Sequence, residues 1–136
     1  MPDTVGPRQA IGAISLVVPD YDEALAFYVG KLGFTLVDDI DQGHKRWVTI
    51  RPPGSAPSST SLLIAKAEGA RQQAAIGNQT GGRVFLFLDT DEFDADYRHL
   101  QAHGVRFDGP TRDETYGRVA VFFDLYGNKW DLVQRR

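Results

Sequence analysis

Apolar and polar residues follow the same succession of patterns twice along the chain. In the first series, residues 10–18 alternate as a strand does, and apolar side chains then recur at helical spacing from Tyr21 to Leu32. Asp20 is placed to cap the start of this helix, and Gly33 is placed to end it. After the helix, residues 34–37 predict a strand, and the segment RWVTIRPPG (46–54) predicts a strand that runs into a Gly-bearing turn. A last strand is predicted in TSLLIAK (60–66), after a Pro/Ser loop over residues 51–61.

The second series repeats this order. Residues 83–88 predict a strand, and apolar side chains at helical spacing from Phe93 to Leu100 predict a helix that Asp91 caps and Gly104 ends. Three more strands are predicted, over residues 105–107, 117–123 and 128–134. The repeated order predicts an internal duplication of a β-α-β-β-β unit.

Two such units side by side predict an α+β fold, with tandem βαβββ modules forming a curved eight-stranded mixed sheet around a concave cavity. We expect one domain, with a loose arm (1–9), a first module (10–66), a flexible linker (67–81) and a second module (82–136). Under the helices we expect a core that contains Leu16, Leu62, Ile64, Leu86, Trp130 and Leu132. The opposite, concave face would be lined by Ala13, Ser15, Leu63, Phe85, Phe87 and Asp131, and a largely apolar concavity is the usual form of a small-molecule site.

Composition narrows the classes of function. The 136 residues carry a net charge of −3, which gives no basic face for nucleic acid. There are no cysteines, so disulfides, thiolate nucleophiles and cysteine-bound metals are excluded. No apolar run approaches the roughly 20 residues of a membrane helix, and the first residues lack the pattern of a signal peptide. We therefore expect a cytoplasmic protein with no membrane partner.

The segment FFDLYGNKWDLVQ, residues 122–134, holds the most unusual polar residue. It predicts a strand, a tight turn and a second strand, and Asp131 is a single acid among the apolar residues of that second strand. Asp131 is either a solvated residue of an edge strand or a carboxyl group that points into the cavity. A carboxyl group in the cavity would be functional, and both interpretations remain open at this point.

Two segments resemble the vicinal oxygen chelate superfamily, which includes glyoxalase I, extradiol dioxygenases, and bleomycin- and fosfomycin-resistance proteins. They are SLVVPDYDEALAFYVGKLGF at 15–34 and the segment 122–134, which is similar to the signature F-x-D-P-x-G-N-x-x-E-L-x-Q with Leu125 for Pro and Asp131 for Glu. The resemblance covers nearly all of residues 10–135, and it implies the paired-module fold and a homodimer. One scaffold hosts many chemistries in this superfamily, so the resemblance does not fix the activity.

The resemblance also implies where a metal ion would be held. Its four ligand positions fall at Ala13, Leu63, Phe85 and Asp131, of which only Asp131 has a donor group. Because a catalytic metal needs about three protein donors, we expect no metal, and we expect no other cofactor. His99 and His103 have a chelating spacing but are expected on the solvated side of their helix.

The remaining candidates favour a cavity that binds a small molecule. Phe87 and Phe85 are expected in the cavity, with Trp47 and Tyr116 at its mouth, Arg118 as an anion clamp, and Ser15 and Thr49 as small donors. We predict metal-independent binding of a small apolar or aromatic ligand. The alternative is an enzyme of this superfamily, a lyase, isomerase or dioxygenase, that uses Asp131 with a non-standard metal or with none. His44 is a weaker candidate for a catalytic residue. A structural or regulatory module is a third interpretation, and the sequence leaves open whether the chain is an enzyme.

Overall fold

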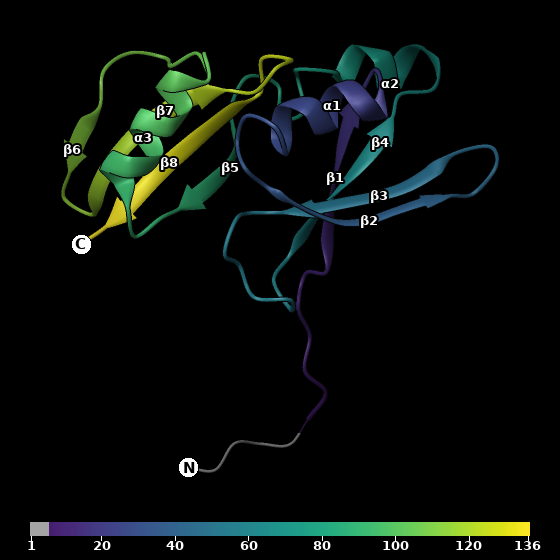
Figure 1. Ribbon diagram of the computed structural model, residues 1–136, viewed down its shortest axis with the longest axis horizontal. Coiled ribbons are helices and arrows are strands. Elements are labelled where there is room, and N and C mark those ends of the chain that lie inside the picture. Colours follow the sequence, from purple (N-terminus) through teal and green to yellow (C-terminus); the bar gives the residue numbers. More distant parts are fainter. Residues whose placement is uncertain (1–5) are drawn as a thin grey trace.

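The computed structural model describes residues 6–136 and folds them into two modules, each with one helix and four strands (Figure 1). The first module contains β1 (Ala13–Val18), α1 (Tyr21–Tyr28), β2 (Thr35–Asp41), β3 (Arg46–Arg51) and β4 (Ser61–Lys66). A short helix, α2 (Gly69–Ala75), precedes the second module, which contains β5 (Val84–Asp89), α3 (Phe93–Ala102), β6 (Arg112–Glu114), β7 (Gly117–Phe123) and β8 (Lys129–Arg135). The α+β fold with tandem βαβββ modules is confirmed.

The eight strands divide into two four-stranded mixed sheets with identical topology. The strand orders are β1-β4-β3-β2 in the first module and β5-β8-β7-β6 in the second. In each sheet the first and last strands of the module are parallel neighbours, and the other pairs are antiparallel. Among the described residues no hydrogen-bonded ladder joins the two sheets, so the curved surface consists of two halves.

The start of α1 follows the prediction, but its end does not. The Asp20 carboxylate accepts a hydrogen bond from the Glu23 backbone N–H at 2.8 Å, as an N-cap does. The regular helix ends at Tyr28, because the N–H groups of Lys31 and Leu32 both bond to the carbonyl of Phe27 and interrupt the helical ladder. Gly33 closes this irregular turn with a φ of 81°.

Two predictions in the second module are wrong. The N-cap of α3 is Glu92 instead of Asp91. The backbone N–H of Glu92 donates to the hydroxyl oxygen of Thr90 at 3.0 Å. Residues 105–107 make only an isolated bridge, between Phe107 and Phe122, and the edge strand is β6. The ring of Phe107 packs against that of Tyr97, with centroids 4.4 Å apart.

One hydrophobic core runs through both modules. Among the predicted core residues, Leu86 is half-buried, and those that are fully buried are Leu16, Leu62, Ile64, Trp130 and Leu132. Trp130 of β8 lies 6.0 Å from the ring of Tyr28 and 5.8 Å from that of Phe34, both of which belong to the first module. Burial of each such side chain stabilises the fold by roughly 1.5–3 kcal/mol, so this aromatic cluster joins the modules.

A buried polar network, centred on the turn between β7 and β8, also joins the modules. The Tyr28 hydroxyl donates to Asp124 Oδ2 at 2.6 Å, and the Asn128 side-chain amide donates to the same oxygen at 2.9 Å. Asp124 Oδ1 accepts from the backbone N–H groups of Tyr126 and Asn128, both at 2.9 Å. The resemblance to the family signature therefore lies in part in residues that hold the two modules together.

The segment between the modules, predicted to be a flexible linker, is hydrogen-bonded to both modules through Gln79. The backbone N–H of Gln79 donates to Asn128 Oδ1 at 3.1 Å, and Gln79 Oε1 accepts from the Val17 N–H at 2.8 Å. Gln79 thus connects β1 to the turn of the second sheet. No helix within residues 6–136 is long and apolar enough to cross a membrane.

Candidate functional site

Strand register defines the sheet faces that α1 and α3 leave uncovered, which we call the open faces. On the first sheet, Ser15 pairs with Leu63, and Leu63 pairs with Thr49 across the next strand. On the second sheet, Phe87 pairs with Asp131, and Asp131 pairs with Val121. These rows are the centres of the two open faces.

The position of Phe85 differs from the expectation. The β5–β8 register shifts between Val84 and Leu86, so the strand partner of Asp131 is Phe87. The ring of Phe85 lies 6.0 Å from that of Trp130 and packs against the core. Phe87, by contrast, is 59% exposed on the open face. A β-bulge changes which side chains share a face, and the alternating pattern alone does not reveal it.

Asp131 is the most unusual group on the open faces. Its side chain lies between Phe87 and Val121, only 6% of the residue is exposed, and Oδ1 is buried with no hydrogen-bond partner within residues 6–136. Burial raises the pKa of this carboxyl group, and the positive charge of Arg112 opposes the shift. Asp131 is therefore not a solvated edge residue. A buried carboxyl oxygen without a donor is costly, and such groups are often functional.

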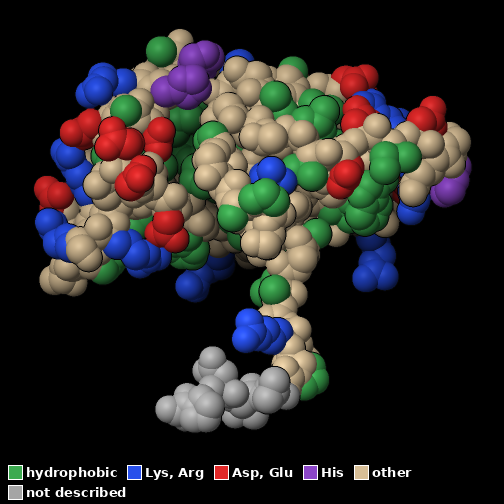
Figure 2. Space-filling model, turned by 60° about the horizontal axis from the view of Figure 1, so that its bottom comes forward, with side chains coloured by type: hydrophobic (Ala, Val, Ile, Leu, Met, Phe, Trp, Pro, Cys, Tyr) green, Lys and Arg blue, Asp and Glu red, His purple; other side chains and the backbone are tan. Residues whose placement is uncertain are grey.

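Two predicted residues meet in a cavity beside the β2–β3 hairpin, which we call the hairpin cavity. It has a volume of about 560 Å³, and His44 and Trp47 line it together with Leu63. Trp47 is 38% exposed, and its strand partner Ile40 is 52% exposed. Hydrophobic side chains are thus accessible on the first module, as Figure 2 also shows on the surface of the molecule.

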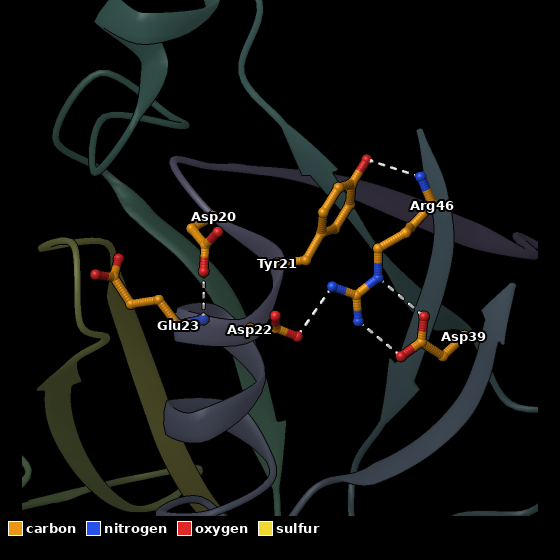
Figure 3. Close-up of polar contacts among 6 residues, drawn as sticks. All are labelled: Asp20, Tyr21, Asp22, Glu23, Asp39 and Arg46. Carbon is orange, nitrogen blue, oxygen red and sulfur yellow. Dashed lines mark hydrogen bonds and ion pairs between the residues drawn. The ribbon is translucent and has the colours of Figure 1, made fainter. Parts of the chain in front are cut away.

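Arg46 fixes the wall of the hairpin cavity (Figure 3). Its guanidinium donates to both oxygens of Asp39 at 3.1 and 2.8 Å, and to Asp22 Oδ1 at 2.9 Å. It also lies over the Tyr21 ring, 5.1 Å from the centroid. The hydrogen bonds from Arg46 lower the pKa of Asp39. Arg46 therefore holds the hairpin against the start of α1, and its donors are already engaged.

A second cavity, of about 620 Å³, lies between the modules, and we call it the inter-module groove. Phe87 lines it on the β5 side, and Pro52 and Pro53 of the β3–β4 loop line it on the other. Its remaining lining residues are Leu32, Gly54, Ser55, Ser59, Thr60, Leu88, Asp89, Thr90, Asp91, Asp96, His99, Leu100 and Leu132. Phe87 thus belongs both to the open face and to this groove.

Three other candidates do not extend the site as expected. Arg118 lies beside α3, donating to Asp94 Oδ1 at 2.8 Å and stacking over Phe93, so it does not face the cavity. Thr49 is buried and its hydroxyl donates to Asp38 Oδ2 at 2.8 Å. Tyr116 is exposed in the turn between β6 and β7, away from both cavities. Ser15 is exposed on the first open face.

The residues at the metal-ligand positions do not fit a metal ion. Of the four family positions, Ala13, Leu63 and Phe85 have no donor group, and Asp131 is the single carboxylate. In the row through Leu63, the Thr49 hydroxyl is already bonded to Asp38. Within residues 6–136 no group of three or more His, Asp or Glu side chains is arranged to hold an ion. His99 Nε2 lies 2.8 Å from the Lys31 carbonyl oxygen, so the ring of His99 is hydrogen-bonded to the backbone of the first module.

Comparison with known proteins identifies the family. The model of the Glyoxalase/Bleomycin resistance protein/Dioxygenase superfamily matches residues 10–132, and the chain belongs to this superfamily. An uncharacterized protein of Shewanella frigidimarina is 54% identical over 129 residues, which are 93% of this chain and 94% of the relative. The structure of TnmS3, an antibiotic binding protein from Streptomyces sp. CB03234, is similar with a TM-score of 0.75 and 32% identity, covering 97% of this chain and 100% of that chain. The structure of UcmS2 is similar with a TM-score of 0.80 and 27% identity, covering 93% and 98%.

The sequence did not single out the acids of the inter-module groove. Asp89 is two residues after Phe87, so simple alternation would have placed both on one face. Asp91 was interpreted only as a helix cap, and Asp96 not at all. Their approach to the β3–β4 loop depends on the packing of the two modules, for which no local pattern exists.

Proposed function

We propose that this protein binds a small apolar or aromatic molecule on its open faces, without a metal ion. The observation that carries the proposal is Asp131, a buried carboxyl group with an unpartnered oxygen beside the exposed ring of Phe87. An aromatic ring can stack on Phe87, while a polar group of the ligand satisfies Asp131. The family, and its member titled an antibiotic binding protein, support this class of function.

Isothermal titration calorimetry measures binding without a reporter residue at the site. Trp47 is exposed, but it lines the hairpin cavity, whose lining has no residue in common with that of the inter-module groove at Phe87. Titration with a panel of planar aromatic antibiotics should give a saturable heat of binding. Phe87→Ala should weaken binding about tenfold, since a stacked ring contributes about 1.4 kcal/mol. Tyr116→Ala is the matched control, and it should leave the dissociation constant unchanged.

The titration also defines what would refute the proposal. If no compound of the panel gives a saturable signal, or if Tyr116→Ala weakens binding as much as Phe87→Ala, the open face is not the binding site. Metal independence has its own measurement. Protein purified without chelator should hold far less than one equivalent of metal by elemental analysis, and added chelator should leave the dissociation constant unchanged.

An enzymatic role for Asp131 is the second candidate. Its raised pKa is what a general acid or base near neutral pH requires, because burial between Phe87 and Val121 disfavours the charged form. An enzyme of this kind would lose turnover in Asp131→Asn while keeping affinity. If Asp131→Asn retains full turnover of an accepted substrate, Asp131 is not the acid or base. The weaker candidate, His44, is tested in the same assay with His44→Gln.

We also propose that the protein acts as a homodimer in the cytoplasm. Exposed apolar residues of β2, among them Leu36 and Ile40, would be covered in a dimer. The absence of cysteine is compatible with a reducing compartment. Sedimentation at micromolar concentration should give twice the mass of one chain, and a stable monomer would contradict the dimer.

A further inference from the structure

Two histidines lie four positions apart at the C-terminal end of α3, away from both open faces. We propose that His99 and His103 bind a divalent transition-metal ion of the class that prefers imidazole ligands, namely Cu²⁺, Ni²⁺ or Zn²⁺. This site is separate from the metal-ligand positions of the family, which lie on the sheets. The inference therefore goes beyond the proposed function, which concerns the open faces.

The helix brings the two imidazole rings together at the surface. Residues four apart share one face of a helix, and the ring centroids of His99 and His103 are 4.1 Å apart, with an angle of 33° between the rings. Both side chains are exposed, and Figure 2 shows histidine side chains gathered at the surface of this module. Ala95 and Ala102, the neighbours of His99 on this face, are too small to cover the rings.

Hydrogen bonds to the backbone fix which nitrogen of each ring is free. His99 Nε2 lies 2.8 Å from the carbonyl oxygen of Lys31, and a carbonyl oxygen only accepts, so this nitrogen carries the proton. His103 Nδ1 lies 2.8 Å from the carbonyl oxygen of His99 and carries a proton for the same reason. The neutral rings therefore keep their lone pairs on His99 Nδ1 and His103 Nε2, and neither atom has a hydrogen-bond partner within residues 6–136.

This arrangement is the one that metal-binding histidines use. A ligating histidine usually donates its other N–H to a backbone carbonyl or a carboxylate, which fixes the orientation of the ring and makes the free nitrogen more basic. Both rings of the pair have such a bond. Two imidazoles that share an ion at about 2.0 Å have ring centroids roughly 4.5 Å apart, so the observed spacing requires only a small rotation of the side chains.

The charges around the pair also favour a cation. The last turn of a helix carries a partial negative charge, and His99 lies in the last turn of α3. Asp96 is three positions before His99, so its carboxyl group lies on the same face of the helix. Arg98 is adjacent to His99 in the sequence and therefore projects from a different side of the helix.

The donor set selects the kind of ion. Imidazole nitrogen suits Cu²⁺, Ni²⁺ and Zn²⁺, whereas Mg²⁺ and Ca²⁺ prefer oxygen. Two protein donors leave the other coordination positions to water, so we expect an exchangeable ion that dialysis removes. Such a site is compatible with the metal-independent binding proposed for the open faces. Affinity should rise from Mn²⁺ through Ni²⁺ to Cu²⁺ and be lower again for Zn²⁺.

Calorimetric titration of the tag-free, full-length protein with each chloride salt tests the inference. We expect one equivalent of Cu²⁺, Ni²⁺ or Zn²⁺ to bind, and no heat of binding with MgCl₂. His103→Ala, and separately His99→Ala, should weaken Zn²⁺ binding about a hundredfold, because the second nitrogen of a chelate binds the ion intramolecularly. The matched control is His44→Ala, which removes the lone histidine of the β2–β3 hairpin and should leave the dissociation constant unchanged.

Two further measurements keep the test independent of folding defects. Nuclear magnetic resonance of the histidine nitrogens should show Zn²⁺ shifting His99 Nδ1 and His103 Nε2, while His99 Nε2 remains protonated. Thermal unfolding at ten times the dissociation constant should show Zn²⁺ raising the melting temperature by about 5 °C in the wild type and in His44→Ala. In His103→Ala, which keeps the bond between His99 and Lys31, the same Zn²⁺ concentration should leave the melting temperature unchanged.

Three results would overturn the inference. They are the absence of saturable binding of any of the three ions, undiminished binding in the variant that lacks both His99 and His103, and equal weakening in His44→Ala. None of these results affects the proposed function, since aromatic ligands and Phe87→Ala test that separately. Conversely, if no aromatic compound binds but Zn²⁺ binds as described, the proposed function is wrong and the metal site stands.

Discussion

Asp124 and Asp131 are two buried carboxyl groups only seven positions apart, and their surroundings are opposite. Asp124, in the turn after β7, is 3% exposed and accepts four hydrogen bonds from Tyr28, Tyr126 and Asn128. Asp131, in the middle of β8, is 6% exposed, and its Oδ1 has no donor in the part of the chain that the structure describes. The first carboxyl group is satisfied by the chain itself, whereas the second is left for something outside the chain.

Within the segment 122–134, Asp124 contributes to the stability of the fold, whereas Asp131 is the candidate for function. A satisfied buried acid holds its neighbours in place, because each of its donors would lose a partner without it. An unsatisfied buried acid costs stability, and proteins retain such groups mainly where they act on a ligand or a substrate. The family signature therefore contains both a structural residue and the candidate functional one.

The largest expected effect is the loss of Asp124. Asp124→Ala leaves the Tyr28 hydroxyl, two backbone N–H groups and the Asn128 amide without their acceptor, so we expect the free energy of unfolding to fall by about 3 kcal/mol. Urea unfolding followed by circular dichroism measures this. The exposed Asp113→Ala is the control and should change stability by less than about 0.5 kcal/mol. Equal effects of the two substitutions would remove the distinction between Asp124 and an ordinary surface acid.

Replacement of Asp131 by an apolar residue should have the opposite sign. Its strand neighbour Val121 and the nearby Val133 indicate that a valine fits this face, and Asp131→Val removes a buried, unpartnered oxygen. We expect the free energy of unfolding to rise by about 1.5 kcal/mol. A destabilised Asp131→Val protein would show that Asp131 has a partner in solution that the chain provides.

The pH dependence of stability sharpens the same point. Burial raises the folded-state pKa of Asp131 above its unfolded value, so between those two values the folded state holds more protons than the unfolded state. This group therefore stabilises the fold at low pH, and its contribution is lost as the pH rises from about 4 through the folded pKa. As the pH rises from about 4 through the folded pKa, the free energy of unfolding of the wild type should fall relative to that of Asp131→Asn. The fall per pH unit should be less than about 1.4 kcal/mol, which is the limit for one proton. Parallel curves for the two proteins from pH 4 to pH 7 would contradict the shift.

The smallest expected effect concerns the connection between the Asp124 network and β1. Gln79→Ala removes the acceptor of the Val17 N–H but leaves the Gln79 backbone bond to Asn128, so we expect a loss of about 1 kcal/mol. The neighbouring Asn78→Ala, at an exposed position, serves as the matched control in the same unfolding experiment. If the two variants have equal stability, the side chain of Gln79 does not contribute to joining the modules.

The sequence predicted most of the architecture because local periodicity carries it. Alternation placed most strands of both modules, Asp20 marked the start of the first helix, and the repeated order of elements revealed the duplication. The predictions that failed depend on individual contacts that local periodicity does not show. Residues 105–107 make a single bridge, between Phe107 and Phe122, and the edge strand forms at residues 112–114 instead. The N-cap of α3 is Glu92, whose N–H donates to the Thr90 hydroxyl oxygen, instead of Asp91.

By itself the sequence determined the paired modules and the lone acid of the last strand, since both follow from residue types at fixed spacing. Only the tertiary structure decided which residues face that acid. A shift of register in β5 brings Phe87 to Asp131 and turns Phe85 to the core, and the packing of the modules brings the β3–β4 loop to Asp89 and Asp91. The physical reason is that burial and hydrogen-bond satisfaction are properties of the assembled sheet, and no single strand specifies them.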